Sequence, residues 1–189
     1  ELWGCTDATI DHNVIETYAV GIFIKGCDGV SIEGNLVSAP DTTTPSDSGI
    51  LIQSSKNISV TANTVSNFTA GDKASYNTGT TGAGIRILSS NETVTIEGNE
   101  LHDNTLGVLV TGATESGSLE IHRNNIEDND VFGVLNCESW VGKDRTHTPA
   151  SVSISATFNW WGDESGPYHA AENPDGKGNA VSDNVYFDP

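Results

Sequence analysis

The sequence is poor in positive charge. Lysine and arginine together number 8 against 26 aspartates and glutamates, so the formal net charge is −18. A surface of this sign repels nucleic acid and anionic membranes, and we therefore expect neither as a partner. Two explanations of the acidity stay open: an acidic secreted protein, or a halophilic one whose surface stays hydrated in strong brine.

Methionine and long apolar runs are absent as well. No stretch approaches the roughly 18 apolar residues of a membrane-spanning helix, and no signal peptide is recognisable. The first residue is Glu1 rather than methionine. We expect a chain without a membrane span that is either a mature product or a domain excised from a larger chain.

The sequence does contain a repeat. Its clearest copy is VTIEGNELHDNTLGVLV at 94–110, with the template apolar-x-apolar-x-x-Asn-x-apolar, a polar turn and Gly-apolar-x-apolar. Related copies begin at Ala8, Val30, Ile58, Leu119 and Ile154. The repeated asparagines, separated by 22, 28, 36, 25 and 35 residues, are Asn13, Asn35, Asn63, Asn99, Asn124 and Asn159. Self-similarity at so short a period is typical of a repeat architecture.

Apolar and polar residues alternate within each copy, which places one set of side chains on one face of a β-strand. Three short strands per turn of about two dozen residues cannot bury a face alone, but stacked turns can share one core. We therefore predict an all-β fold, a single-stranded parallel β-helix solenoid of about six to seven coils with loop inserts.

Stacking brings equivalent residues of neighbouring coils to one strand spacing, about 4.8 Å. The repeat then predicts columns of like aliphatic residues: Val30, Ile58, Val94 and Leu119; Ile32, Val60, Ile96 and Ile121; Val37, Val65, Leu101 and Ile126; Ile22, Ile50, Ile85, Val108 and Val134. The six asparagines would form a ladder at an inward bend, each amide bonding to the next coil, because an inward polar group must be paired.

These repeats resemble the right-handed parallel β-helix repeats of the pectin-lyase-like superfamily over residues 8–161. The ending NWWGDESGP at 159–167, followed by NPDGKG at 173–178, resembles the terminal signature of secreted archaeal and bacterial surface β-helices. Some of these are similar to the copper-maturation protein of nitrous-oxide reductase. The resemblance implies a right-handed solenoid but no single function, because this scaffold hosts lyases, hydrolases, epimerases, adhesins and spacers.

The sequence lacks the full catalytic residue sets of two enzymes of that superfamily. The Asn-Thr-Asp, Asp-Asp, Gly-His-Gly and Arg-x-Lys series of polygalacturonases is missing, and Arg86 resembles the base of a pectate lyase without an accompanying calcium triad. A copper site needs Met, Cys or clustered His ligands. The sequence has no methionine, and its histidines are dispersed over His12, His102, His122, His147 and His169.

We expect one domain, with coils over 1–161 and a capping segment over 162–189 to which the apolar tail 185–187 adds a final strand. Residues 2–7 align with 24–29 one coil later, so the chain starts in mid-coil. A bare strand edge is normally covered. We expect a preceding part of a larger chain, or another chain, to cover it.

Cysteine is scarce, and two of the three cysteines occupy the same coil position. Cys5 and Cys27 lie 22 residues apart, and one strand spacing between them falls within the Cα separation of a disulfide. The sequence predicts a bridge between these residues, which would fit an extracellular setting, with two reduced buried thiols as the alternative. We interpret Cys137 as a small buried hydrophobe.

Three inserts read as loops, and loops on a rigid scaffold often carry binding. Two of them, 39–48 and 69–83, should leave the same edge of successive coils. The third, 138–149, is predicted to bind a ligand because an aromatic residue and cations could hold a sugar and its carboxylate or sulfate; these residues are Trp140, Lys143, Arg145 and His147. The alternative is a flap whose tryptophan covers the core edge and whose cations balance nearby carboxylates.

Acidic residues collect on the turn after the asparagine ladder. Asp103, Asp128 and Asp130, with Arg86 as a cation, are candidate catalytic residues for glycoside cleavage. Glu127, Asp128 and Asp130 could instead hold Ca²⁺ through oxygen ligands, and an ordinary solvated acidic face is the third interpretation. Calcium is the only cofactor that the sequence suggests.

Taken together, these features predict a secreted or cell-surface β-helix scaffold that presents loops to a carbohydrate or surface partner. The first alternative is a polysaccharide lyase or glycoside hydrolase acting on an acidic polysaccharide, in which Arg86 or Arg145 neutralises a uronate. The second is a structural spacer in a surface array. Carboxylates and an arginine in one groove would favour the enzyme.

Overall fold

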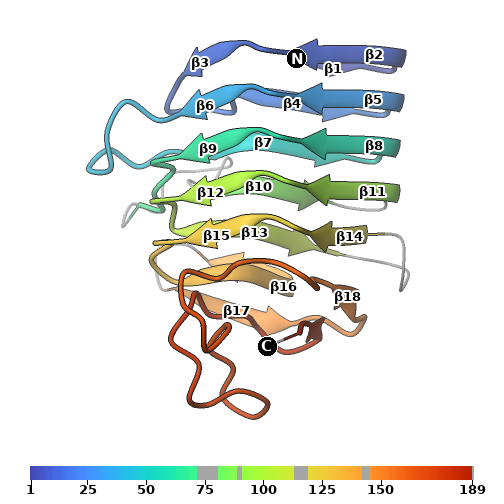
Figure 1. The fold of residues 1–189 in the computed structure, drawn as a ribbon. Helices are drawn as coiled ribbons and strands as arrows, with labels where there is room; N and C mark the ends of the chain where they lie inside the picture. The colour runs from blue at the N-terminus through green and yellow to red at the C-terminus, as the bar shows by residue number, and fades with distance from the viewer. Residues whose placement is uncertain (72–80, 89–90, 113–118, 142–144, 189) are drawn as a thin grey trace.

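The computed structural model describes residues 1–71, 81–88, 91–112, 119–141 and 145–188. These residues wind into stacked coils that run from the N-terminal coil at the top of Figure 1 to the C-terminal segment at the bottom. Each regular coil gives one short strand to each of three sheets, here called A, B and C. No helix in the described ranges has the length and apolarity to cross a membrane.

The strands of sheet A, in chain order, are β1 (Leu2–Trp3), β4 (Ile22–Lys25), β7 (Ser48–Gln53), β10 (Ala83–Leu88), β13 (Leu106–Thr111), β16 (Phe132–Val141) and β17 (Thr146–Pro149). Those of sheet B are β2 (Thr6–Asp11), β5 (Asp28–Glu33), β8 (Lys56–Thr61), β11 (Glu92–Glu97), β14 (Leu119–His122), β18 (Ile154–Ser155) and β19 (Val185–Tyr186). Those of sheet C are β3 (Val14–Glu16), β6 (Leu36–Ser38), β9 (Thr64–Ser66), β12 (Glu100–His102) and β15 (Asn125–Glu127). All neighbours pair in parallel except β16 and β17, which form an antiparallel hairpin.

The predicted aliphatic columns are confirmed. In sheet B, Val94 pairs with Ile58 on one side and Leu119 on the other. In sheet C, Leu101 pairs with Val65 and Ile126, and in sheet A, Ile85 pairs with Ile50 and Val108. These side chains are buried in one continuous core. The alternation of the repeat thus fixes the register, because a slip of one residue would turn every aliphatic outward.

The repeated asparagines lie between sheets B and C, and each Nδ2 donates to the Oδ1 of the next coil's asparagine. The distances along Asn13, Asn35, Asn63, Asn99, Asn124 and Asn159 are 2.9, 2.9, 3.0, 2.9 and 3.0 Å. The backbone N–H of each residue donates to the same oxygen. The inward amides are therefore paired, as a buried polar group must be.

The C-terminal segment completes the last coil with pieces from distant parts of the sequence. Strand β18 continues sheet B, Trp160 bridges to Asn125 of sheet C, and Val181 bridges to Val134 of sheet A. The tail then pairs with β18 as β19, which confirms the expected final strand. Trp161 and Phe187 are buried in the core beneath these pieces.

Candidate functional site

A column of polar residues follows the strands of sheet C. Asn67, Asp103 and Asp128 come directly after β9, β12 and β15, and all three have positive φ, at 67°, 56° and 54°. Asparagine and aspartate tolerate this left-handed conformation better than other residues with a side chain. The same sharp corner therefore recurs in successive coils, and it stacks the carboxylates of Asp103 and Asp128 along one edge.

A second asparagine ladder, which the sequence analysis missed, holds this corner from inside. Asn104 Nδ2 donates to Asn129 Oδ1 at 3.1 Å, and Asn129 Nδ2 donates to Asn179 Oδ1 at 2.8 Å. Both Asn104 and Asn129 are buried. The signal that could have revealed the first two members is the Asp-Asn pair at 103–104, repeated 25 residues later at 128–129.

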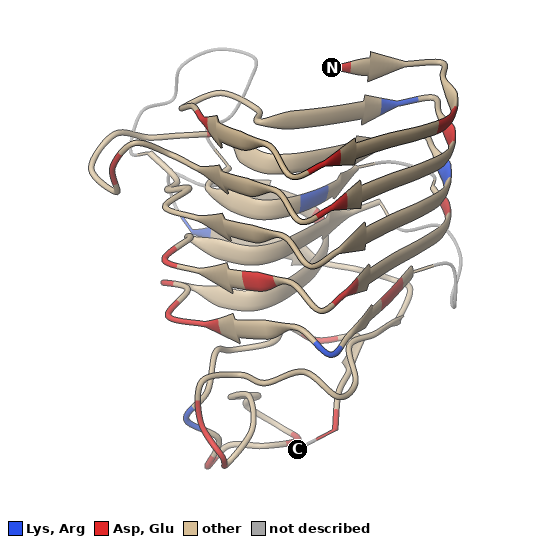
Figure 2. Ribbon diagram, turned by 45° about the horizontal axis from the view of Figure 1, so that its top comes forward, with Lys and Arg blue, Asp and Glu red and all other residues tan. Residues whose placement is uncertain are grey.

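The corner forms a depression of about 300 Å³, here called the acidic depression. Its lining residues are Thr42, Thr69, Asp103, Asn104, Asp128 and Asp130. The structure thus brings together the three aspartates predicted from the sequence, and the two threonines come from the two inserts on this edge. Figure 2 shows acidic residues recurring along the coils, with basic residues few and scattered.

The three acidic residues considered for calcium do not converge. Glu127 Oε1 accepts a hydrogen bond from Asn125 Nδ2 at 2.8 Å, and its Oε2 accepts one from Trp160 Nε1 at 3.4 Å. Glu127 is also not among the residues that line the acidic depression. Within the described ranges, no three His, Cys, Asp or Glu side chains are grouped as a metal site.

Arg145 reaches the acidic depression from the β16–β17 hairpin. Its Nη2 lies 2.6 Å from Asp130 Oδ2, in an ion pair whose side chains are both about half exposed. A guanidinium held by a carboxylate in this way is already partly neutralised. The pair matches the alternative interpretation of this insert, in which its cations balance nearby carboxylates.

Trp140 is placed as in the alternative interpretation of this insert, a flap whose tryptophan covers the edge of the core. Trp140 is half-buried and packs against the outward face of sheet A, on a cluster that contains Leu106, Leu109 and Leu135. The physical reason is that β16 continues beyond its coil to Val141, which folds the tryptophan back over these leucines. Lys143 lies outside the described residues.

Arg86 does not share the acidic depression. It lies on β10 between Leu51 and Leu109 of the neighbouring strands, and its Nη1 is 3.5 Å from Asp47 Oδ1. Burial lowers the pKa of its guanidinium, although the Asp47 carboxylate opposes that change. Arg86 and the three aspartates therefore do not form the groove that a lyase-like site with Arg86 as its base would need.

A second depression, of about 450 Å³, lies between the hairpin and the C-terminal segment and is here called the cap pocket. Aromatic and imidazole rings line it: Phe132 and His147, whose centroids are 5.5 Å apart at 89°, together with Tyr168 and His169. Of the predicted ligand-binding residues, His147 lines this pocket. Asp130 lines the acidic depression and the next residue, Val131, lines the cap pocket, so the linings of the two meet at this point of the chain.

His169 has a fixed orientation in the cap pocket. Its Nδ1 accepts a hydrogen bond from the backbone N–H of Glu172 at 3.0 Å, so Nε2 carries the proton that faces Asp183 Oδ1 at 3.3 Å. Ser182 does not complete a catalytic triad, because its Oγ bonds to the backbone of Asn136 instead. The arrangement positions a carboxylate at the wall of the pocket and supplies no nucleophile.

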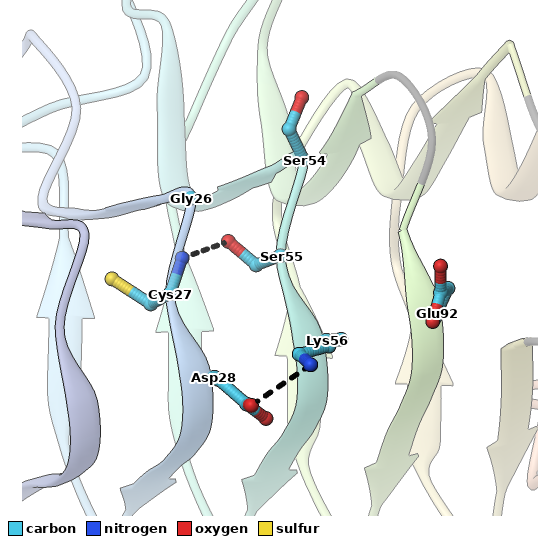
Figure 3. Close-up of a pocket in the computed structure, with 7 residues that line it drawn as sticks. All are labelled: Gly26, Cys27, Asp28, Ser54, Ser55, Lys56 and Glu92. Atoms are coloured by element: carbon cyan, nitrogen blue, oxygen red, sulfur yellow. Dashed lines mark hydrogen bonds and ion pairs between the residues drawn. The ribbon is translucent and has the colours of Figure 1, made fainter.

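Of the two stacked cysteines, Cys27 lines a smaller depression of about 180 Å³ (Figure 3). Two of the charged groups there pair, Lys56 Nζ lying 3.0 Å from Asp28 Oδ2. The Sγ atoms of Cys5 and Cys27 are 2.7 Å apart, longer than a disulfide bond of about 2.05 Å, and both residues are free thiols. The predicted bridge is therefore not formed here, although the thiols are in contact.

Cys137 is fully buried, and burial together with the nearby Glu138 carboxylate raises the pKa of its thiol to about 11. A thiol with so high a pKa is protonated at neutral pH and is a poor nucleophile.

Comparison with known proteins adds to this geometry. Comparisons with curated proteins and with solved structures give no significant match. A family model described as "Right handed beta helix region" matches residues 1–141, which is most of the chain. Together with the stacked parallel strands, this match confirms the predicted right-handed solenoid, and the chain belongs to the right-handed β-helix family.

Proposed function

We propose that this protein is a β-helix scaffold that binds carbohydrate at the edge formed by the acidic depression and the adjoining cap pocket. The observation that carries the proposal is that the linings of these two depressions meet at residues 130 and 131 on one frame. Carboxylates accept hydrogen bonds from sugar hydroxyls, and aromatic side chains offer an apolar face with a polar rim. A site with both features suits a ring that is apolar on its faces and hydroxylated at its edge.

The frame supports this proposal because it preorganises the edge. Asp103 and Asp128 are held in register by buried asparagines of the second ladder, so little conformational entropy remains to be lost on binding. The threonines of the acidic depression come from inserts, the variable part of the repeat, while the carboxylates come from the repeat itself.

Retention on immobilised polysaccharides tests the proposal. We expect the protein to be retained on at least one of a panel of neutral, amine-bearing and uronate polymers, and Asp103→Asn with Asp128→Asn to weaken retention. Asparagine keeps the left-handed backbone and removes only the charge. The matched control is Asp11→Asn with Glu33→Gln, two exposed carboxylates that pair on adjacent coils of sheet B. Retention on none of the polymers would refute the binding of polysaccharide along this edge.

Catalysis is the second candidate because Asp103, Asp128 and Asp130 share one depression. Two carboxylates flanking a glycosidic bond can act as acid and as base or nucleophile. The same incubations would show it through new reducing ends or through the ultraviolet absorbance of unsaturated ends, with and without Ca²⁺. Product that disappears in the Asp103→Asn, Asp128→Asn variant would establish an enzyme, whereas retention without product would leave the binding scaffold.

The proposal includes a location outside the cell or at its surface. The net charge of −18 and the NWWGDESGP ending, which resembles surface β-helices, support it. Protease treatment of intact source cells tests this location: release or digestion of the protein is expected, and full protection would contradict it.

A further inference from the structure

We propose that the cap pocket is a subsite for one pyranose ring and that it prefers a neutral or amine-bearing sugar to a uronate. This inference rests on the proposed carbohydrate binding and names the class of sugar. Most residues of the cap pocket lie outside the sequence repeat, and those around Phe132 are the exception. The pocket forms where the C-terminal segment returns to the hairpin.

The size and walls of the pocket fit a single ring. Its volume of about 450 Å³ lies within the range of small-ligand sites, roughly 300–1,000 Å³. Phe132 and the half-exposed Tyr168 offer aromatic surface from two different parts of the chain. Ala170 and Ala180 also line the pocket, with small side chains. Aromatic side chains that keep their shape on binding contribute area at low entropic cost.

The polar groups of the pocket can accept hydrogen bonds from the hydroxyl or ammonium groups of a sugar. The Asp183 carboxylate is largely exposed, and one of its oxygens faces the buried His169, whose tautomer is fixed by the Glu172 backbone. The second oxygen of Asp183 is not used in that contact and can accept a hydrogen bond from a ligand. Among the residues that the structure describes, no lysine or arginine lines the pocket, and its two histidines are His147 and His169.

Negative charge in and around the pocket disfavours the binding of a uronate. A sugar carboxylate in the pocket would face Asp183, and Arg145 of the hairpin is already paired with Asp130. The whole chain adds a net charge of −18, which lowers the local concentration of anions. An ammonium group would gain from the same field and from the aromatic faces.

Three glycosides that share one ring test the inference: methyl β-glucoside, methyl β-glucosaminide and methyl β-glucuronide. Titration of the intact protein followed by NMR of the Tyr168 and His147 ring signals should give saturable shifts with the first two. The glucuronide should bind at least about tenfold more weakly, a difference of roughly 1.4 kcal/mol. Added salt should narrow the gap, because screening weakens the repulsion.

Variants then locate the binding. Tyr168→Ala should abolish the shifts of the His147 ring, while Tyr168→Phe keeps the aromatic wall and should retain most of the affinity. Tyr186→Ala is the matched control, because Tyr186 is an exposed tyrosine on β19 outside the pocket. Asp183→Asn should reduce the preference for the glucosaminide and improve glucuronide binding.

The outcomes separate this inference from the broader proposal. Equal or tighter binding of the glucuronide, or binding that survives Tyr168→Ala, would overturn the cap pocket as the subsite. If polymer retention is then lost only in the Asp103→Asn, Asp128→Asn variant, carbohydrate binding stands and the subsite fails. Glycoside binding at the cap pocket without retention on any polymer would support the subsite and refute the scaffold that binds along the edge.

Discussion

The two ends of the solenoid differ in how far their cores are covered. In the first coil, Leu2, Ile10 and Ile15 point toward the core but are only partly buried, and Val14 is 80% exposed. In the last coil, Trp161 is 2% exposed and Phe187 is 7% exposed. The first coil pairs with a neighbour on one side only, whereas the last coil is closed by chain that returns from the C-terminal segment.

The same contrast applies to the tryptophans at the two ends. Trp3 is 61% exposed and lies edge-on to Phe23, with Lys25 Nζ 4.8 Å from its ring centroid. Trp161 lies in the main core and is almost completely buried. Trp3 pairs with Lys25 on the outward column of sheet A, whereas Trp161 points into the core. Because stabilisation scales with the apolar area removed from water, the two tryptophans should contribute very differently.

The largest expected effect is at the tryptophans. Trp161→Ala removes a fully buried indole and should lower the free energy of unfolding by about 3–5 kcal/mol. Trp3→Ala should cost less than about 1 kcal/mol, since most of the ring is already in water. Urea unfolding of both variants measures the difference. Similar losses would contradict the difference in burial between the two tryptophans.

Oxidation of the two stacked cysteines should reduce the contrast between the ends. With oxidised glutathione as the acceptor of two electrons and two protons, Cys5 and Cys27 should form a disulfide and release two glutathione thiols. The bridge closes a loop over a separation of 22 residues, and such a loop is worth about 3 kcal/mol. The intact mass should fall by two hydrogens, and the urea midpoint should rise.

Cys5→Ser is the control for oxidation and should show neither change. Burial and the neighbouring Cys27 raise the pKa of the Cys5 thiol, so the reaction should accelerate with rising pH as thiolate forms. A protein that keeps its mass under these conditions would contradict the predicted bridge.

The asparagine ladder offers a comparison of one residue type at two positions. Asn99 is buried, and its Oδ1 accepts from both the backbone and the side chain of Asn63 at 2.9 and 3.0 Å. Asn99→Ala leaves the buried backbone N–H of Asn63 without its acceptor and should cost about 2 kcal/mol. For Asn13, at the open end, no described group donates to Oδ1, and Asn13→Ala should cost less. Thermal melts of the two variants should differ by several degrees, and equal melting temperatures would contradict the comparison.

The smallest effect concerns pH. Tyr18 and the backbone and side chain of Thr43 donate to Asp41, and these bonds hold its pKa well below the usual value. Bonds from Ser165 lower the pKa of Asp163 near the other end. A carboxylate whose pKa is lower in the folded state stabilises the fold at pH values above its pKa in the unfolded chain, about 3.9. This contribution is lost as the pH falls through the pKa of the folded state.

Carboxyl NMR shifts followed from pH 5 downward measure both groups. We expect Asp41 and Asp163 to titrate below about pH 3.9, with Asp41 the lower of the two. Both groups are at the surface, so the effect on the melting temperature should be slight. Titration of Asp41 in its normal range would show that the contact with Tyr18 does not persist.

The sequence predicted those parts of the molecule that repeat. Val94, Ile96 and Leu101 have counterparts in every neighbouring coil, so their columns and register follow from spacing alone. The first asparagine ladder was predictable for the same reason. The turn carboxylates Asp103 and Asp128 were expected to be close because they occupy equivalent positions on adjacent coils.

The remaining features depend on contacts outside the repeat. Asn179 ends the second ladder at a separation of 50 residues from Asn129, and no period in the sequence links them. The sequence left the placement of Trp140 open, because the length of β16 decides whether it faces solvent or the leucines of sheet A. The cap pocket joins 131–132 to 168–183, which only the fold of the C-terminal segment brings together.

The walls of the cap pocket do not depend on how many coils precede it. All of its lining residues come from the stretch 131–183, whereas each regular coil before it contacts mainly its immediate neighbours. Insertion or deletion of a whole coil early in the chain would move the pocket along the axis by about one strand spacing, 4.8 Å, without altering its walls. Solenoids of this kind can therefore differ in length while they keep the same pocket at the C-terminal end.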